Sequence, residues 1–91
     1  MNITVYIFTL NNCGYCSNLK KNLTNISIPY TEIEITNNKE IWDQVVKQTG
    51  HNLLPTVFIK KGDSEEGPVY VPGRDYQNES DIVEIIKKHF N

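Results

Sequence analysis

The stretch ITVYIFTLNNCGYC, residues 3–16, organises the rest of the chain. Its first six residues are apolar or β-favouring on both alternating faces, which predicts a central strand buried on each side. Two asparagines interrupt this run, and Cys13-Gly14-Tyr15-Cys16 follows directly, before a stretch with helical spacing at residues 17–26. The sulfur of Cys13 should therefore lie at or just before a helix N-terminus. Unpaired N–H groups and the helix dipole favour a thiolate over a thiol there.

Length and composition limit what kind of protein this is. Its 91 residues correspond to one domain, residues 1–91. A net charge of -2 argues against a nucleic-acid surface, and no run approaches the roughly 18 apolar residues of a membrane span. We see no signal peptide. Small secreted domains usually carry several disulfides, whereas this chain has two cysteines, so we expect a cytoplasmic protein. We also expect it to be a monomer.

Strand and helix patterns alternate along the chain and predict the order β-α-β-α-β-β-α. A half-exposed edge strand is expected at residues 30–35, and a hairpin of two strands at 54–59 and 69–71. Strands joined through a helix should be parallel, with a right-handed crossover. The expected fold class is therefore α/β, with a four-stranded mixed sheet and helices on both faces.

The three predicted helices have signals at their ends and apolar stripes facing inward. Asn37 and Glu40 resemble a capping box that opens the second helix, Gly50 is placed to close it, and Asn78 is the expected N-cap of the third. We expect the following side chains to face the core: Leu19, Leu23 and Ile26 in the first helix, Ile41, Trp42, Val45 and Val46 in the second, and Ile82, Val83, Ile85, Ile86 and Phe90 in the third.

A Cys-x-x-Cys pair has three readings. A structural zinc site needs two more ligands, but the only histidines, His51 and His89, are far apart in the sequence and there is no second cysteine pair. An inert structural disulfide would close a very small loop and add little stability. A redox centre suits the position at a helix N-terminus, so no bound metal is expected in the primary interpretation.

The redox interpretation assigns different roles to the two cysteines. Cys13, at the helix start, should have a lowered pKa and attack a disulfide sulfur. Cys16, one turn into the helix and more shielded, should then resolve the mixed disulfide. Tyr15 is placed to wall one side of the site, although it also reads as a plain exposed aromatic residue.

Two segments resemble the glutaredoxin family. Residues 13–16 are similar to the family's Cys-Pro-Tyr-Cys, and residues 49–59 look like its Thr-Gly-x-x-Thr-Val-Pro-x-Val-Phe-Ile. The resemblance covers essentially the whole chain, and it implies a thioredoxin-like fold with glutaredoxin topology and a cis peptide bond before Pro55. It further implies a thiol–disulfide oxidoreductase with glutathione as reductant. Its substrates would be glutathione mixed disulfides or protein disulfides, such as that of ribonucleotide reductase.

The resemblance also implies a glutathione site. The backbone of Leu54 would pair with the cysteinyl part of glutathione, and Pro55 would lie beside Cys13, with Tyr15 also part of the site. The turn containing Gly73, Arg74 and Asp75 would hold the γ-glutamyl end, and Asp75 also reads as a plain turn residue.

The sequence departs from the family pattern at two places. Leu10 stands where many glutaredoxins have a lysine that binds glutathione, which leaves open a glutathione-independent, thioredoxin-like reductase. Gly14 replaces the motif proline, as in some members that assemble a [2Fe–2S] cluster between two protomers, with Cys13 as the ligand from each chain.

Overall fold

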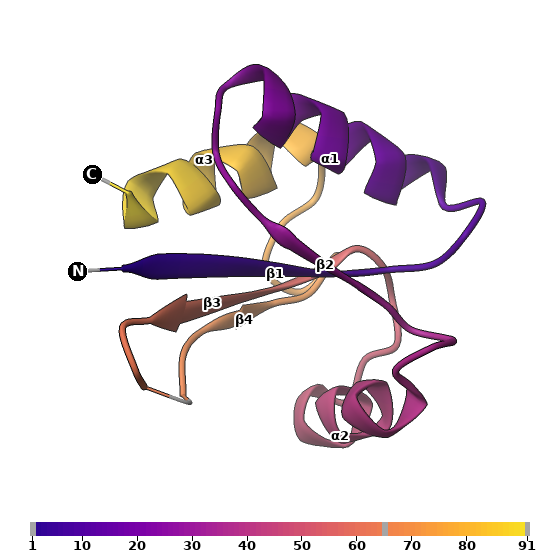
Figure 1. The fold of residues 1–91 in the computed structure, drawn as a ribbon. Coiled ribbons are helices and arrows are strands. Elements are labelled where there is room, and N and C mark those ends of the chain that lie inside the picture. Colours follow the sequence, from indigo (N-terminus) through magenta and orange to yellow (C-terminus); the bar gives the residue numbers. More distant parts are fainter. Residues whose placement is uncertain (1, 65, 91) are drawn as a thin grey trace.

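A computed structural model describes residues 2–64 and 66–90 and shows an α/β fold built on one sheet (Figure 1). The strands lie in the order β2-β1-β3-β4, with β1 parallel to β2 and antiparallel to β3, and β3 antiparallel to β4. This confirms the predicted element order, the central first strand and the mixed sheet. The elements are β1 (Ile3–Thr9), α1 (Gly14–Asn25), β2 (Thr31–Glu34), α2 (Lys39–Thr49), β3 (Thr56–Lys61), β4 (Val69–Tyr70) and α3 (Glu79–His89).

Helices α1 and α3 cover one face of the sheet, and α2 lies on the other (Figure 1). The main core lies under α1 and α3, because alternate residues of the two central strands point toward these helices. Its buried members are Val5, Ile7, Leu19, Leu23, Val57, Ile59, Tyr76, Ile82 and Ile86.

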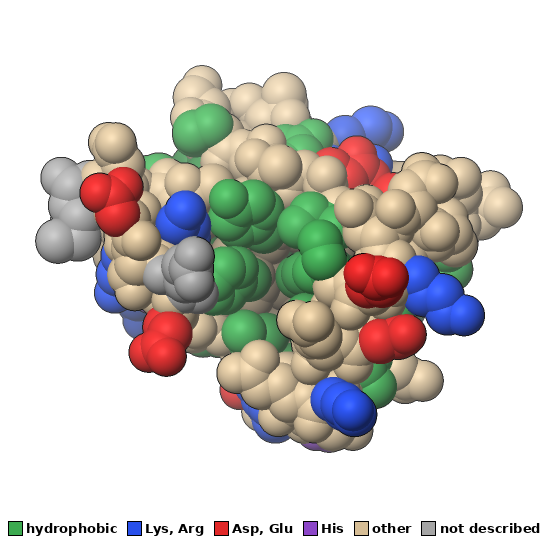
Figure 2. Space-filling view, turned by 60° about the horizontal axis from the view of Figure 1, so that its bottom comes forward, with side chains coloured by type: hydrophobic (Ala, Val, Ile, Leu, Met, Phe, Trp, Pro, Cys, Tyr) green, Lys and Arg blue, Asp and Glu red, His purple; other side chains and the backbone are tan. Residues whose placement is uncertain are grey.

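The opposite face of the sheet is only partly covered. Trp42 of α2 packs on Phe8 with ring centroids 5.5 Å apart, and the rings of Tyr6 and Phe58 stack beside them at 5.8 Å. Figure 2 shows hydrophobic side chains gathered on this side of the molecule. Trp42 is thus a core residue, as predicted.

Helix α1 begins at Gly14, three residues earlier than the periodicity predicts. Cys13 is its N-cap, with extended backbone (φ -87°, ψ 106°), and its Sγ accepts a hydrogen bond from the N–H of Cys16 at 3.1 Å. The cysteine side chain performs the capping role that Ser or Asp usually takes, so the helix includes the residues between the two sulfurs.

The prediction that Ile26 is buried is wrong, since it is 44% exposed. Ser27 adopts a left-handed conformation (φ 60°) after α1. The N–H of Ile28 bonds to Leu23 O at 2.9 Å and that of Ser27 to Thr24 O at 3.1 Å. These are the two bonds of a Schellman motif, after which the half-buried Ile28 packs against the core while Ile26 stays outside it.

Two expectations for α2 are also wrong. The N-cap is Asn38 rather than Asn37, and it makes no side-chain capping bond, because its Nδ2 donates to Glu34 O at 2.9 Å. Ile41 is 48% exposed, since the helix points Trp42 at the sheet and each residue turns about 100° from the last. Val45 and Val46 are half-buried, and Gly50 ends the helix with φ 74°, as predicted.

In α3, Asn78 is the N-cap as predicted, and its side chain accepts from the N–H of Asp81 at 3.0 Å. Ile82 and Ile86 are buried, but Phe90 is 39% exposed, which corrects the prediction that it faces the core. Phe90 is the C-cap residue, one position past the last helical turn. No helix in the described part of the chain is long and apolar enough to cross a membrane.

Candidate active site

The cysteine pair lies where β1 leads into α1. The chain turns after Thr9, with Asn12 at φ 70° and the N–H of Cys13 bonded to Leu10 O at 3.1 Å. In the structure the two sulfurs form a Cys13–Cys16 disulfide, and the Cα atoms are 5.2 Å apart. A tight turn onto a helix start therefore fixes both cysteines.

The two sulfurs have different environments. Cys13 is half-buried, whereas Cys16 is 1% exposed. The N–H of Cys16 points at Cys13 Sγ, and the first turn of α1 contains no acidic residue that would offset the helix dipole. When the pair is reduced, the thiolate is thus favoured at Cys13, the accessible position.

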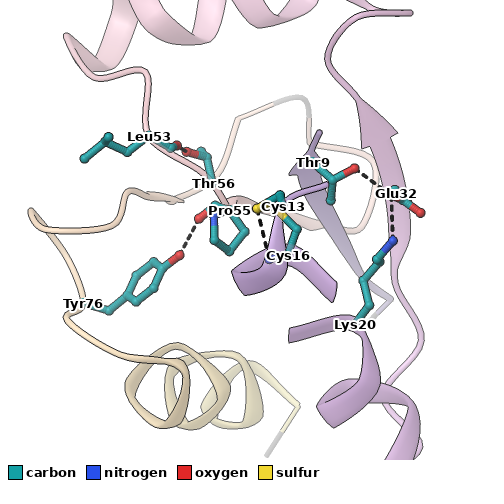
Figure 3. Close-up of a disulfide and its surroundings, with 9 residues drawn as sticks. All are labelled: Thr9, Cys13, Cys16, Lys20, Glu32, Leu53, Pro55, Thr56 and Tyr76. Atoms are coloured by element: carbon teal, nitrogen blue, oxygen red, sulfur yellow. Dashed lines mark hydrogen bonds and ion pairs between the residues drawn. A yellow bond between two sulfur atoms is a disulfide. The ribbon is translucent and has the colours of Figure 1, made fainter. Parts of the chain in front are cut away.

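A second loop faces the pair from the start of β3 (Figure 3). The Leu54–Pro55 peptide bond is cis, in agreement with the resemblance. Thr56 Oγ1 donates to Leu53 O at 2.7 Å, and the hydroxyl of Tyr76 donates to Pro55 O. Within residues 2–64 and 66–90, the N–H and C=O of Leu54 have no hydrogen-bond partner. This leaves a donor and an acceptor for a bound extended segment.

A cavity of about 510 Å³ runs beside α1 between this loop and the connection from β4 to α3. Tyr15 and Leu19 line one side, Leu54 and Pro55 another, and Tyr76 the third. Neither sulfur is among the lining residues, but Tyr15 stands between the two cysteines, so the cavity adjoins the disulfide.

The structure brings only some of the expected binding residues into this cavity. Tyr15, Leu54 and Pro55 line it, and Tyr15 remains 77% exposed. Gly73, Arg74 and Asp75 do not line it, although Pro72 and Tyr76 on either side of them do.

Arg74 and Asp75 instead bond within their own turn. Asp75 Oδ2 accepts from the N–H of Val71 at 2.7 Å and from Arg74 Nε at 2.9 Å. Burial opposes ionisation of the Asp75 carboxyl, but the hydrogen bonds from Arg74 and Val71 outweigh it and lower its pKa. Asp75 thus stabilises its own turn, which is the plain turn role that the sequence left open.

Two sets of contacts among the elements around the site were not predicted. Tyr76 is 6% exposed, and burial raises the pKa of its hydroxyl. Glu32 accepts hydrogen bonds from Thr9 at 2.6 Å and from Lys20 at 2.9 Å, and these lower the pKa of its carboxyl. No sequence pattern marks either contact, because each joins residues at least 12 positions apart.

Comparison with known proteins gives a consistent result. The Glutaredoxin family model matches residues 5–63. Glutaredoxin 1 of Rickettsia typhi is 36% identical over 58 residues, which cover 62% of this chain and 56% of that protein. The match therefore spans little more than half of the relative's length.

Solved structures of similar fold include a glutaredoxin–glutathione complex from buckwheat, with a TM-score of 0.58 and 22% identity over 93% of this chain and 69% of that one. A thioredoxin-like protein, solved as a mutant, gives a TM-score of 0.62 and 16% identity over 96% of this chain and 99% of that one. At these identities the structures establish the thioredoxin-like fold.

Proposed function

The chain belongs to the glutaredoxin family, and from that premise we propose that it reduces glutathione mixed disulfides or protein disulfides through Cys13 and Cys16. One observation carries the proposal. The half-buried Cys13 caps α1 and receives a hydrogen bond from the N–H of Cys16, whose own sulfur is buried. A nucleophile and a shielded resolving thiol need this arrangement.

The reaction starts from the reduced pair. The Cys13 thiolate attacks one sulfur of the substrate disulfide, forms a mixed disulfide and expels the other sulfur as a thiolate. The Cys16 thiolate then attacks Cys13 Sγ, re-forms the Cys13–Cys16 bond and releases the second substrate thiolate. The pair loses two electrons, the substrate disulfide gains them, and the two released thiolates take protons from solvent.

Glutathione is the proposed reductant. Two molecules return the pair to the dithiol and leave as glutathione disulfide. The unpaired N–H and C=O of Leu54 and the wall formed by Tyr15 and Pro55 support binding of the cysteinyl part. The turn of Gly73, Arg74 and Asp75 is proposed for the γ-glutamyl end, because Tyr76 next to it lines the same cavity.

We propose that residues 1–91 act as one domain and a monomer. The proposed location is the cytoplasm, where a glutathione pool keeps such pairs reduced. Proteins with accessible disulfides, such as ribonucleotide reductase, are the proposed macromolecular partners. The family membership supports this class of partner.

The first experiment measures turnover of a peptide glutathionylated at its single cysteine, with glutathione as reductant. We expect Cys13→Ser to be inactive. Cys16→Ser should keep part of the activity, since a second glutathione can resolve the mixed disulfide on Cys13. With a protein disulfide as substrate, both variants should be inactive. Equal turnover of the unmodified protein and Cys13→Ser would refute the assignment.

Two further experiments test the alternative functions, a thioredoxin-like reductase and a cluster-binding protein. Turnover that requires thioredoxin reductase and NADPH, and that glutathione does not sustain, would indicate the thioredoxin-like reductase. In the structure the Cys13 sulfur is bonded to Cys16, so this redox state offers no thiolate to iron and we derive no step through a cluster. Anaerobic reconstitution with iron, sulfide and glutathione tests that role, with Gly14→Pro as the matched control. A coloured dimer of the unmodified protein alone would favour the cluster.

A further inference from the structure

Tyr76 connects the two walls of the cavity beside the disulfide. It belongs to the connection between β4 and α3, and its hydroxyl donates to the backbone oxygen of Pro55, 21 positions earlier in the chain. Figure 3 shows the tyrosine reaching toward the Pro55 loop from this connection. One hydrogen bond thus joins the loop that faces the cysteines to the turn on the far side of the cavity.

The tyrosine is itself held firmly. The residue is 6% exposed and forms part of the main core. Its backbone oxygen accepts from the N–H of Gly73 at 2.8 Å, and it forms a bridge with Pro72. A side chain anchored at both its backbone and its ring has few alternative positions, so its hydroxyl is a fixed donor.

Hydrogen bonds occupy the carbonyl oxygens of the residues on either side of Leu54. Thr56 occupies the C=O of Leu53, and Tyr76 occupies that of Pro55. Between them, the N–H and C=O of Leu54 have no partner in the described part of the chain. An extended segment that carries a disulfide would use this donor and this acceptor.

We propose that Tyr76 is a positioning residue that holds the Leu53–Pro55 loop in register with Cys13, so that Leu54 can pair with the backbone of a bound disulfide substrate. The inference rests on the proposed function. Burial raises the pKa of the hydroxyl, so it stays protonated and donates throughout the pH range of thiolate chemistry.

The test compares Tyr76→Phe with Tyr70→Phe. Each change removes one hydroxyl and keeps the ring. Tyr70 bonds His89 Nε2 at 2.8 Å on α3 and does not line the cavity. The reduced proteins are mixed with the glutathionylated peptide for a single turnover, free thiols are trapped at set times, and the rate is measured against peptide concentration.

For Tyr76→Phe we expect the half-saturating peptide concentration to rise about three- to tenfold, which is the effect expected if the misplaced loop weakens the pairing of Leu54 with the peptide by about one hydrogen bond. The maximal rate and the pKa of Cys13 should stay unchanged, because the Tyr76 hydroxyl bonds to Pro55 O whereas Cys13 Sγ accepts from the N–H of Cys16. Tyr70→Phe should leave all three quantities unchanged. An unaltered half-saturating concentration in Tyr76→Phe, or an equal rise in both variants, would overturn the inference.

A second measurement does not depend on activity. In NMR spectra of the disulfide form, Tyr76→Phe should shift or broaden the amide signals of Leu53 and Leu54, whereas Tyr70→Phe should not. Unchanged signals in Tyr76→Phe would contradict a positioning role even if the enzyme is active. An unmodified protein without turnover would instead refute the proposed function, and the NMR result would still decide whether Tyr76 holds the loop.

Discussion

Thr9 donates a 2.6 Å hydrogen bond from its Oγ1 to Glu32 Oε2, and Lys20 Nζ contacts the same oxygen at 2.9 Å (Figure 3). Thr9 ends the central strand, Glu32 lies on the edge strand β2, and Lys20 lies on α1. One carboxylate oxygen therefore links three elements around the cysteine pair. Strand β1 precedes the pair, α1 contains Cys16, and β2 pairs with β1.

This contact predicts a pH-dependent part of the stability. The bonds from Thr9 and then Lys20 lower the pKa of Glu32 below its usual 4.5 in the folded state. The unfolded chain therefore binds the proton more tightly. The stabilisation is complete above about pH 4.5 and is lost as pH falls through the lower folded value.

Glu32→Gln should remove this part of the pH dependence. The side chain is 38% exposed, so solvent screening limits the effect on the free energy of unfolding to under about 1 kcal/mol. Urea denaturation between pH 3 and 7 measures it, and Glu84→Gln, in the exposed pair with Lys87, is the control. A pH profile of Glu32→Gln parallel to that of the unmodified protein would contradict the prediction.

Gly14→Pro should be tolerated and slightly stabilising. Gly14 is the first residue of α1, where proline fits because its missing N–H has no helical partner. A Cβ there meets no atom within 4 Å, and the extended Cys13 suits a following proline. We expect a gain of about 0.4–1 kcal/mol in the free energy of unfolding by urea denaturation.

Gly67→Ala is the contrasting variant, because a Cβ there would overlap the carbonyl oxygen of Ile59. It should destabilise the protein in the same denaturation assay. A loss of stability in Gly14→Pro equal to that in Gly67→Ala would mean that the helix start differs from the structure.

Ile86→Ala should lower the free energy of unfolding much more than Ile26→Ala, although both substitutions remove the same atoms. Ile86 is fully buried in the main core, and its truncation should cost about 2–5 kcal/mol in free energy of unfolding. Ile26 is the C-cap residue of α1 and is 44% exposed, so its truncation should cost under about 1 kcal/mol. Chemical denaturation measures both, and similar losses would show that α1 ends differently.

His89 should titrate below the ordinary histidine value. Burial, and then the positive charge of Lys61, lower its pKa from 6.5. The unfolded chain therefore takes up this proton more readily, and the contribution to stability is complete above about pH 6.5 and declines as pH falls through the folded value. NMR titration of the imidazole protons measures the midpoint, and a midpoint at or above 6.5 would contradict the prediction.

Features that depend on neighbouring residues can be read from the sequence. The apolar run at residues 3–8 predicted the central strand, and Cys13 before a helical pattern predicted a sulfur at a helix start. Asn78 and Gly50 marked helix ends through their own backbone preferences. The family resemblance likewise rested on contiguous residues, at 13–16 and 49–59, and the family model confirmed it.

Which residues meet across the fold could be learned only from the three-dimensional structure. Ile26 fits the helical period, yet after the left-handed Ser27 it is Ile28 that packs against the core instead. Ile41 and Phe90 also fit their periods, but a period does not tell how far the sheet extends beneath a helix. The contacts of Tyr76 with Pro55 and of Thr9 with Glu32 arise from long-range packing. Local preferences choose the elements, while burial and hydrogen bonding between distant segments choose their partners.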